Sequence, residues 1–308
     1  MGIFKMNVAK VAHLTGHSNA IYSLEKSIYQ NSIYSSSADG FIVEWDIEKK
    51  GDGKLIANIQ KPIYSLLTLN KAQQLFCGTS EGNLHLIDLI QNKETRNIEA
   101  HTLGLFDLQK TAKNLISAGG DGFVCIWNID DLSLLHKIKV ADKSCRVIAV
   151  SPDEKTIAIG SSDSAISIFE TENFELIHKI EAHKNSVFAL SYSPDGINLV
   201  SSGRDAMLKV FDIANHYEMV MDIPSHTAQV KCISYNNSGK LFATSSMDKT
   251  IKIWNAENFE LLKVIDKERN DSHTNCINKL LWMNDETLVS CSDDRAVMVW
   301  KILKEDII

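Results

Sequence analysis

Short apolar runs alternate with turn-forming residues along this chain, and the arrangement returns every 40 to 46 residues. In one copy, apolar runs at residues 187–192 and 199–202 flank the sequence Ser193-Pro194-Asp195-Gly196. Proline presets its backbone angle for a reverse turn, and Asp and Gly suit the other turn positions, so the two runs predict a β-hairpin. A further short run follows in other copies, for example at residues 134–138 and 176–180. Each copy therefore predicts four antiparallel strands, and no stretch longer than a turn favours a helix.

Seven copies share an acidic turn residue that is followed six positions later by a hydrophobic residue. The seven pairs are Asp39/Trp45, Glu81/Ile87, Asp121/Trp127, Asp163/Phe169, Asp205/Phe211, Asp248/Trp254 and Asp294/Trp300. A repeat of this period indicates one supersecondary unit that is stacked repeatedly. The copies extend from about residue 8 to residue 302 without a linker, so we predict a single domain over residues 1–308. Residues common to the copies should stabilise the fold, and specific binding is expected where the copies differ.

Three features of the first copy carry a family resemblance: His17 after Gly16, the turn residue Asp39, and the pair Trp45-Asp46. They resemble the Gly-His and Trp-Asp signature of the WD-repeat β-propeller family. The resemblance implies an all-β, seven-bladed propeller in which each blade is a four-stranded sheet beside a central channel. The last copy supplies only three strands, ending at residues 300–302, and a spare strand lies at residues 8–14. Pairing the two would complete blade 7 and cover an exposed sheet edge.

Five copies carry a histidine and a hydroxyl residue together with the turn Asp. The sets are His17, Ser35, Asp39 and Trp45; His101, Ser117, Asp121 and Trp127; His183, Ser201 and Asp205; His226, Thr244, Asp248 and Trp254; and His273, Ser290, Asp294 and Trp300. The second and fourth copies have Cys77 and Ile159 in place of the hydroxyl residue, and neither has the histidine. The resemblance implies a buried hydrogen-bond chain from Trp to hydroxyl to His to Asp. Such a chain is favourable only when every member has a partner, which favours a structural role over catalysis.

The resemblance also implies that partners dock on the face where the inner strands begin. Carried onto this sequence, it selects Tyr22, Tyr64, Phe106, Arg146, Phe188 and Lys231 on six inner strands, Asn278 on the seventh, and Arg204 before a turn Asp. We expect all of these except Asn278 to bind the partner, because aromatic and Arg side chains dominate interface energies. Small neighbours lead us to expect that Tyr22, Tyr64 and Phe106 stand clear of the rim. The alternative, that each aromatic ring merely packs against the next blade, stays open.

Composition narrows the classes of partner and the compartment. The chain has 32 basic and 39 acidic residues and no basic run, so we expect no nucleic-acid partner. The basic mouth residues instead suggest a protein or peptide that presents apolar side chains and an acidic or phosphorylated group. The six cysteines form no Cys-x-x-Cys pair, so we expect buried thiols, no metal site and no cofactor. No apolar run is long enough to span a membrane, and a soluble, cytoplasmic protein is expected.

Three function classes remain. The first is a non-catalytic scaffold that binds a protein or peptide at the channel mouth. The second is an architectural subunit clamped through its blade sides, which would need a broad apolar patch on outer strands whose visible residues, such as Lys137 and His178, are mixed. The third is a propeller enzyme of hydrolase or lactonase type, which would need carboxylates or histidines converging on the channel. The starts of the inner strands offer almost none.

Overall fold

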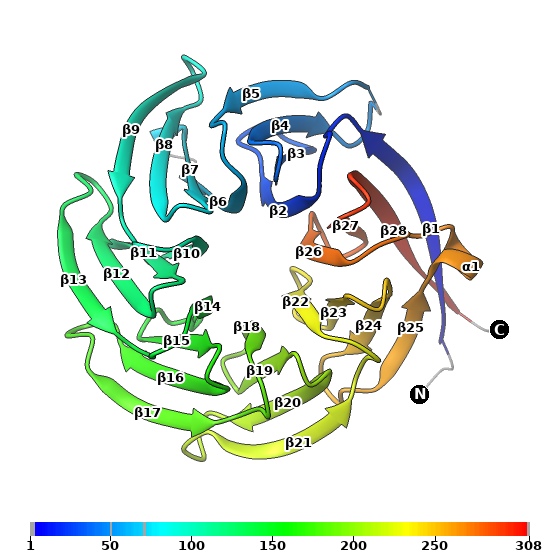
Figure 1. The fold of residues 1–308 in the computed structure, drawn as a ribbon. Helices are drawn as coiled ribbons and strands as arrows, with labels where there is room; N and C mark the ends of the chain where they lie inside the picture. The colour runs from blue at the N-terminus through cyan, green and yellow to red at the C-terminus, as the bar shows by residue number, and fades with distance from the viewer. Residues whose placement is uncertain (1–3, 50, 70–71, 307–308) are drawn as a thin grey trace.

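The computed structural model describes residues 4–49, 51–69 and 72–306, and it is a ring of seven antiparallel sheets around a central channel (Figure 1). Each sheet has four strands that lie side by side from the channel outwards. Blade 1 contains β2 (Ile21–Lys26), β3 (Ser32–Ser37), β4 (Phe41–Asp46) and β5 (Lys54–Asn58). Blade 2 contains β6 (Ile63–Leu69), β7 (Gln74–Thr79), β8 (Asn83–Asp88) and β9 (Lys93–Glu99). Blade 3 contains β10 (Leu105–Lys110), β11 (Asn114–Gly119), β12 (Phe123–Asn128) and β13 (Leu134–Lys139).

The second half of the ring repeats the same order. Blade 4 contains β14 (Cys145–Val150), β15 (Thr156–Ser161), β16 (Ala165–Glu170) and β17 (Leu176–Glu181). Blade 5 contains β18 (Val187–Tyr192), β19 (Asn198–Gly203), β20 (Met207–Asp212) and β21 (Glu218–Pro224). Blade 6 contains β22 (Val230–Tyr235), β23 (Leu241–Ser246), β24 (Ile251–Asn255) and β25 (Leu261–Ile265). Blade 7 contains β26 (Ile277–Trp282), β27 (Thr287–Ser292), β28 (Ala296–Asp306) and, outermost, β1 (Phe4–Thr15). The predicted four-stranded units and seven blades are confirmed.

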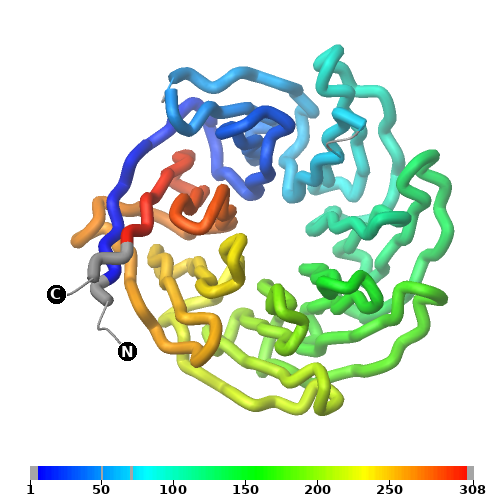
Figure 2. Tube along the Cα trace, turned by 180° about the vertical axis from the view of Figure 1, so that it is seen from behind, coloured from blue at the N-terminus to red at the C-terminus, as the bar shows by residue number. Residues whose placement is uncertain are grey.

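The N-terminal strand closes the ring, as predicted. β1 pairs antiparallel with β28 from Phe4 opposite Asp306 to Thr15 opposite Ala296. Figure 2 shows β1 along the outer edge of this blade, beside β28. Both strands extend past the expected bounds, since β1 begins before residue 8 and β28 ends after residue 302, and the ladder continues past the part that the other blades repeat.

The turn acids hold the hairpin between the second and third strand of a blade. In blade 1, the Oδ1 atom of Asp39 accepts a hydrogen bond of 2.9 Å from the backbone N–H of Phe41. Gly40, between them, has a φ of 82°, a left-handed conformation that glycine adopts without a steric penalty. Asp121 accepts in the same way from the N–H of Phe123 in blade 3. The turn Asp holds its own hairpin in this way in six blades, whereas Glu81 of blade 2 forms an ion pair with Lys61 instead.

The hydrophobic core lies between neighbouring blades. One cluster joins Ile42 and Ile56 of blade 1 to Ile63, Leu66 and Leu75 of blade 2. Another joins Ala12, Leu14 and Val299 of blade 7 to Leu24 and Trp45 of blade 1. Since each blade buries one face against the next, removing any strand exposes apolar surface on two blades.

The rest of the chain agrees with the expected all-β class. All six cysteines are buried free thiols. The helix α1 (Lys267–Asn270) is a single turn between blades 6 and 7, capped by Asp266. Within the described ranges, no helix is long and apolar enough to cross a membrane.

Candidate functional site

A β-bulge near the start of every inner strand positions the side chains at the channel mouth. In β2, Ile21 pairs with Ser37 and Ser23 pairs with Ser36, which leaves Tyr22 between them without a partner on β3. The other six inner strands have the same register shift. The seven bulged residues are Tyr22, Tyr64, Phe106, Arg146, Phe188, Lys231 and Asn278. A bulge redirects its side chain, and all seven line the central cavity of about 980 Å³.

Six of the bulged side chains form a continuous arc over blades 1 to 6, which we call the mouth arc. The ring centroids of Tyr22 and Tyr64 are 5.2 Å apart, edge to face, and those of Tyr64 and Phe106 are 5.5 Å apart, stacked. The guanidinium carbon of Arg146 lies 4.2 Å from the Phe106 centroid and 5.6 Å from that of Phe188. The ammonium nitrogen of Lys231 lies 5.1 Å from the same Phe188 centroid. The arc therefore consists of aromatic contacts over blades 1 to 3 and of cation–aromatic contacts over blades 3 to 6.

These contacts correct two expectations about the mouth. Tyr22, Tyr64 and Phe106 are half-buried, so the expectation that they stand clear of the rim is wrong. Each ring packs on the ring of the next blade and also lines the cavity, so the two alternatives considered from the sequence occur together. Burial, followed by the neighbouring Tyr64, raises the pKa of Tyr22. Arg204 is exposed and lies outside the residues that line the cavity.

Arg146 is the most constrained cation of the mouth arc. Its Nε atom donates a hydrogen bond of 2.8 Å to Oγ of Ser162. Burial lowers the pKa of its guanidinium. Among the described residues, no carboxylate lies within ion-pair distance of Arg146 or Lys231. A guanidinium held in this way presents its remaining N–H groups to an incoming anion.

Below the mouth, the channel contains charged side chains that the sequence reasoning missed. Asp107, only 7% exposed, accepts hydrogen bonds from the backbone N–H of Leu108 (3.0 Å) and of Ile148 (2.8 Å), which ties blade 3 to blade 4. Burial raises the pKa of Glu25 to about 7 and also raises that of Asp107. Burial, the largest single effect, lowers the pKa of Lys279, but Asp107, Cys232, Glu25 and Cys291 together outweigh it and the net shift is upwards.

The expectation that almost no carboxylate converges on the channel is therefore wrong. Asp107 and Lys279 each follow a bulged residue directly, so the same repeat alignment read one position further would have found them. Both oxygens of Asp107 are occupied by backbone donors, which is the arrangement of a structural carboxylate. Nowhere in the described part of the chain do three or more His, Cys, Asp or Glu side chains gather to hold a metal ion.

The repeated His, hydroxyl, Asp and Trp residues lie together inside the blades. In blade 1, Nδ1 of His17 lies 3.0 Å from Oδ2 of Asp39, and Nε2 lies 2.8 Å from Oγ of Ser35. The indole N–H of Trp45 donates to the same Oγ at 2.7 Å. The chains of blades 3, 6 and 7 have the same order, through His101, His226 and His273. In blade 5, His183 contacts Asp205 and Ser201 without a Trp donor.

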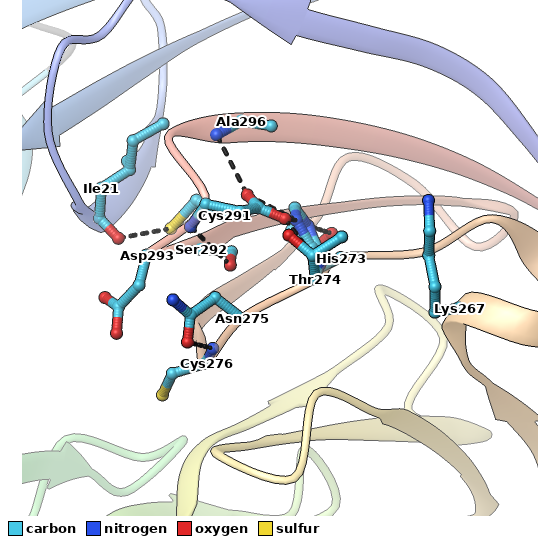
Figure 3. Close-up of polar contacts among 12 residues, drawn as sticks. Ile21, Lys267, His273, Thr274, Asn275, Cys276, Cys291, Ser292, Asp293 and Ala296 are labelled. Carbon is cyan, nitrogen blue, oxygen red and sulfur yellow. Dashed lines mark hydrogen bonds and ion pairs between the residues drawn. The ribbon is translucent and has the colours of Figure 1, made fainter.

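Figure 3 shows the surroundings of His273 in blade 7. Oδ1 of Asp294 accepts a hydrogen bond from the N–H of Ala296, and the carboxylate of Asp294 also contacts His273. The side chain of the neighbouring Asp293 points away from this buried group. It accepts a hydrogen bond of 2.8 Å from Nδ2 of Asn278 at the mouth. Of these two successive aspartates, Asp294 thus binds inside the blade and Asp293 binds at the channel mouth.

The environment of the buried histidines fixes their neutral form. Burial lowers the pKa values of His17, His101, His183 and His226, although the partner Asp opposes this in each case. A neutral ring donates from Nδ1 to the carboxylate and accepts at Nε2 from the hydroxyl, which in turn accepts from Trp. For Asp121, burial opposes ionisation, but the N–H of Thr102 and His101 outweigh it and its pKa is lowered.

Two further side chains differ from the simple repeat picture. His178 was expected to face solvent on an outer strand, but it is half-buried, with its ring centroid 5.2 Å from that of Tyr217 in the next blade. In blade 2, which lacks the repeated histidine, the buried His85 lies 3.0 Å from Oε1 of Glu94 on the outermost strand.

Comparisons with known proteins agree with this architecture. Residues 103–275, more than half of the chain, match the family model of the echinoderm microtubule-associated protein second beta-propeller, and residues 9–46 and 266–301 match that of the WD domain, G-beta repeat. The crystal structure of the WD40 beta-propeller domain of Doa1 superposes with a TM-score of 0.85 at 20% identity, over 96% of this chain and 97% of that chain. At that identity, the likeness concerns the fold alone.

Curated relatives match over shorter stretches. Cilia- and flagella-associated protein 337 B of Tetrahymena thermophila is 32% identical over 151 residues, which are 44% of this chain and 12% of that protein. WD repeat-containing protein 90 of Xenopus tropicalis is 31% identical over 81 residues, 26% of this chain and 4% of that protein. The Protein LST8 homolog of Drosophila melanogaster is 23% identical over 113 residues, 34% of this chain and 36% of that protein. These matches span well under half of each relative's length.

Proposed function

The chain is a WD-repeat β-propeller that belongs to the family of the echinoderm microtubule-associated protein second beta-propeller, and we propose that it is a non-catalytic scaffold. It binds a protein or peptide segment across the channel mouth. One observation carries the proposal. In all seven blades a bulge turns one side chain to the mouth, and these side chains differ from blade to blade while the surrounding repeat is kept. Binding specificity is expected at such variable positions of a repeat array.

The chemistry of the mouth arc supports a ligand with both apolar and anionic groups. Tyr22, Tyr64, Phe106 and Phe188 offer aromatic surface, which contributes much binding energy for few immobilised rotors. Arg146 and Lys231 suit a carboxylate or phosphate. WD-repeat propellers generally bind proteins or peptides, so we infer an acidic or phosphorylated peptide rather than nucleic acid or membrane. The buried free thiols suit a reducing, intracellular compartment.

Affinity purification from the native cell tests this function. The tagged protein is compared with a Tyr64→Ala/Arg146→Glu double variant and with Lys179→Glu, a charge-matched control on the outer strand β17. We expect the double variant to lose its specific partners and the control to keep them. The opposite outcome, in which only the Lys179 variant loses them, would move the docking surface to the side of the ring.

The exposed apolar residues on the outer strands favour a second candidate, an architectural subunit clamped through its sides. Blades 3 to 6 each present such residues where the outer strand begins: Leu134 and Leu135, Leu176 and Ile177, Met219 to Met221, and Leu261 and Leu262. The outer surface is mixed, as expected, because the same strands also carry exposed charged residues such as Lys137 and Lys179. Exposed apolar groups in several neighbouring blades are typical of protein contacts. A Leu176→Glu/Ile177→Glu variant that loses partners which the mouth variant retains would support this second function.

A further inference from the structure

Charged side chains at the channel mouth are separated by sign. Arg146 of blade 4 and Lys231 of blade 6 both lie over the ring of Phe188, and Lys249 of blade 6 also lines the cavity. The acidic side chain at the same level is Asp293 of blade 7. Glu25, Asp107 and Lys279 line the channel below the mouth and are not counted among the mouth charges. The mouth therefore has a cationic side on blades 4 to 6 and an anionic side on blade 7.

Neither side is neutralised by the protein itself. In the described ranges, no ion pair involves Arg146, Lys231, Lys249 or Asp293, although the rim residues Lys61 and Glu81 do pair with each other. Partly desolvated charges without a counter-charge cost free energy in the unbound protein. Two charges of opposite sign at one mouth that do not reach each other are therefore available to a ligand.

Both charges are also held in place. Ser162 fixes Arg146 through Nε, and Phe106 and Phe188 lie against its guanidinium. Asn278 holds Asp293 through one Nδ2–H and donates a second hydrogen bond of 2.9 Å to the carbonyl oxygen of Ile21 in blade 1. Side chains that are ordered before binding lose little entropy on binding, so their geometry can select a ligand.

We propose that the mouth reads charge order: it binds an extended peptide with an acidic side chain at Arg146 and Lys231 and a basic side chain at Asp293. This inference rests on the proposed function and specifies the ligand class. The apolar side chains between the two charges pack on the rings of the mouth arc. A peptide with the two charges exchanged meets a like charge at each end, which discriminates against it more strongly than losing one contact does.

Selection from a phage-displayed library of random peptides tests the charge order without knowledge of the natural partner. The full chain is immobilised as wild type, as Arg146→Glu/Lys231→Glu, as Asp293→Lys and as the variant that combines all three changes. We expect wild-type selections to be enriched in peptides with an acidic and a basic residue in one N-to-C order at a fixed separation. The combined variant should select the reverse order, and each of the other two variants should lose the preference for one of the two charges.

Two controls keep the outcomes distinct. Arg146→Gln and Asp293→Asn remove each charge with little change in shape, and thermal melts show whether every variant is folded. A synthetic peptide from the wild-type selection should bind on the order of tenfold to a hundredfold more tightly than its charge-exchanged isomer, and the combined variant should invert that ratio.

The same selections separate this inference from the proposed function. Selected peptides that lose binding to Tyr64→Ala but show no charge order would overturn the charge-order inference and leave mouth binding standing. Selected peptides whose binding is insensitive to Tyr64→Ala and to all the charge variants would overturn both.

Discussion

Removing the N-terminal strand is the sharpest test of the architecture. Deleting residues 1–14 would leave β28 as an uncovered edge of blade 7, because β1 pairs with it along its whole length. The apolar residues Ala12 and Leu14 of β1 belong to the cluster that joins blade 7 to blade 1, so their loss would also weaken the seam of the ring.

The structure gives the size of the expected effect. Leu14 is 4% exposed, and burying a leucine side chain contributes about 1.5–3 kcal/mol. Each hydrogen bond of the ladder contributes about 0.5–1.5 kcal/mol net. A handful of these bonds together with Leu14 exceeds roughly 5 kcal/mol, the lower end of the usual 5–15 kcal/mol for a whole domain. We therefore expect the truncated protein to be largely unfolded, or to self-associate through the exposed edge of β28.

Thermal unfolding and light scattering of the intact and truncated proteins measure this effect. Leu14→Ala is a milder version that should cost about 2–5 kcal/mol. Lys10→Ala is a control in the same strand: it removes an exposed ion pair with Asp271 and should cost less than about 1 kcal/mol. A truncated protein that stays monomeric with an unchanged unfolding midpoint would refute closure by this strand.

Three further predictions concern the interior and the mouth. His101→Ala should lower the free energy of unfolding by about 1–3 kcal/mol, because its partners lose a buried hydrogen bond. His13→Ala, at an exposed histidine, is the control and should change the free energy of unfolding by no more than about 0.5 kcal/mol. Equal costs in denaturant titrations would contradict the buried hydrogen-bond chain. Tyr64→Ala should weaken partner binding by about 1–3 kcal/mol. It should also lower the melting temperature measurably, since the Tyr64 ring is half-buried between the rings of Tyr22 and Phe106. Calorimetry that finds neither effect would exclude a role for this ring. The pKa of Glu25 is about 7 in the folded protein against an ordinary 4.5, so the stability from its protonated form is complete below pH 4.5 and is lost as the pH rises through 7. Glu25→Gln should therefore gain stability over the wild type between pH 5 and pH 8, and parallel stability curves for the two proteins would disprove the raised pKa.

Local repetition explains how much of the fold the sequence reveals. In six of the seven blades the turn Asp recurs because it accepts a hydrogen bond from the backbone N–H two residues later, so the blades can be counted without knowledge of their arrangement. The closure of the ring could be predicted because the last copy has only three strands and a spare strand lies at the N-terminus. The alignment also selected the residue that forms the bulge in each inner strand, although the bulge itself leaves no signature in any single copy.

Contacts between blades could not be predicted from the sequence, because they join residues that no local pattern relates. The stacking of Tyr64 on Phe106 and the position of Arg146 between two rings depend on how neighbouring blades are placed. The influence of Asp107 on Lys279 links side chains of blades 3 and 7. The repeat predicts the position of each side chain within its blade, and the assembled ring determines what that side chain meets.

The pairing of β1 with β28 has a mechanical consequence. Phe4 lies opposite Asp306, so the start of β1 and the end of β28 lie at the same end of one antiparallel ladder. A force that pulls these ends apart acts across the strands and breaks the hydrogen bonds pair by pair, as in unzipping. A force along the strands would instead shear many bonds at once. Under tension between its ends the propeller therefore opens first at blade 7, one residue pair at a time, while the other six blades carry little of the load.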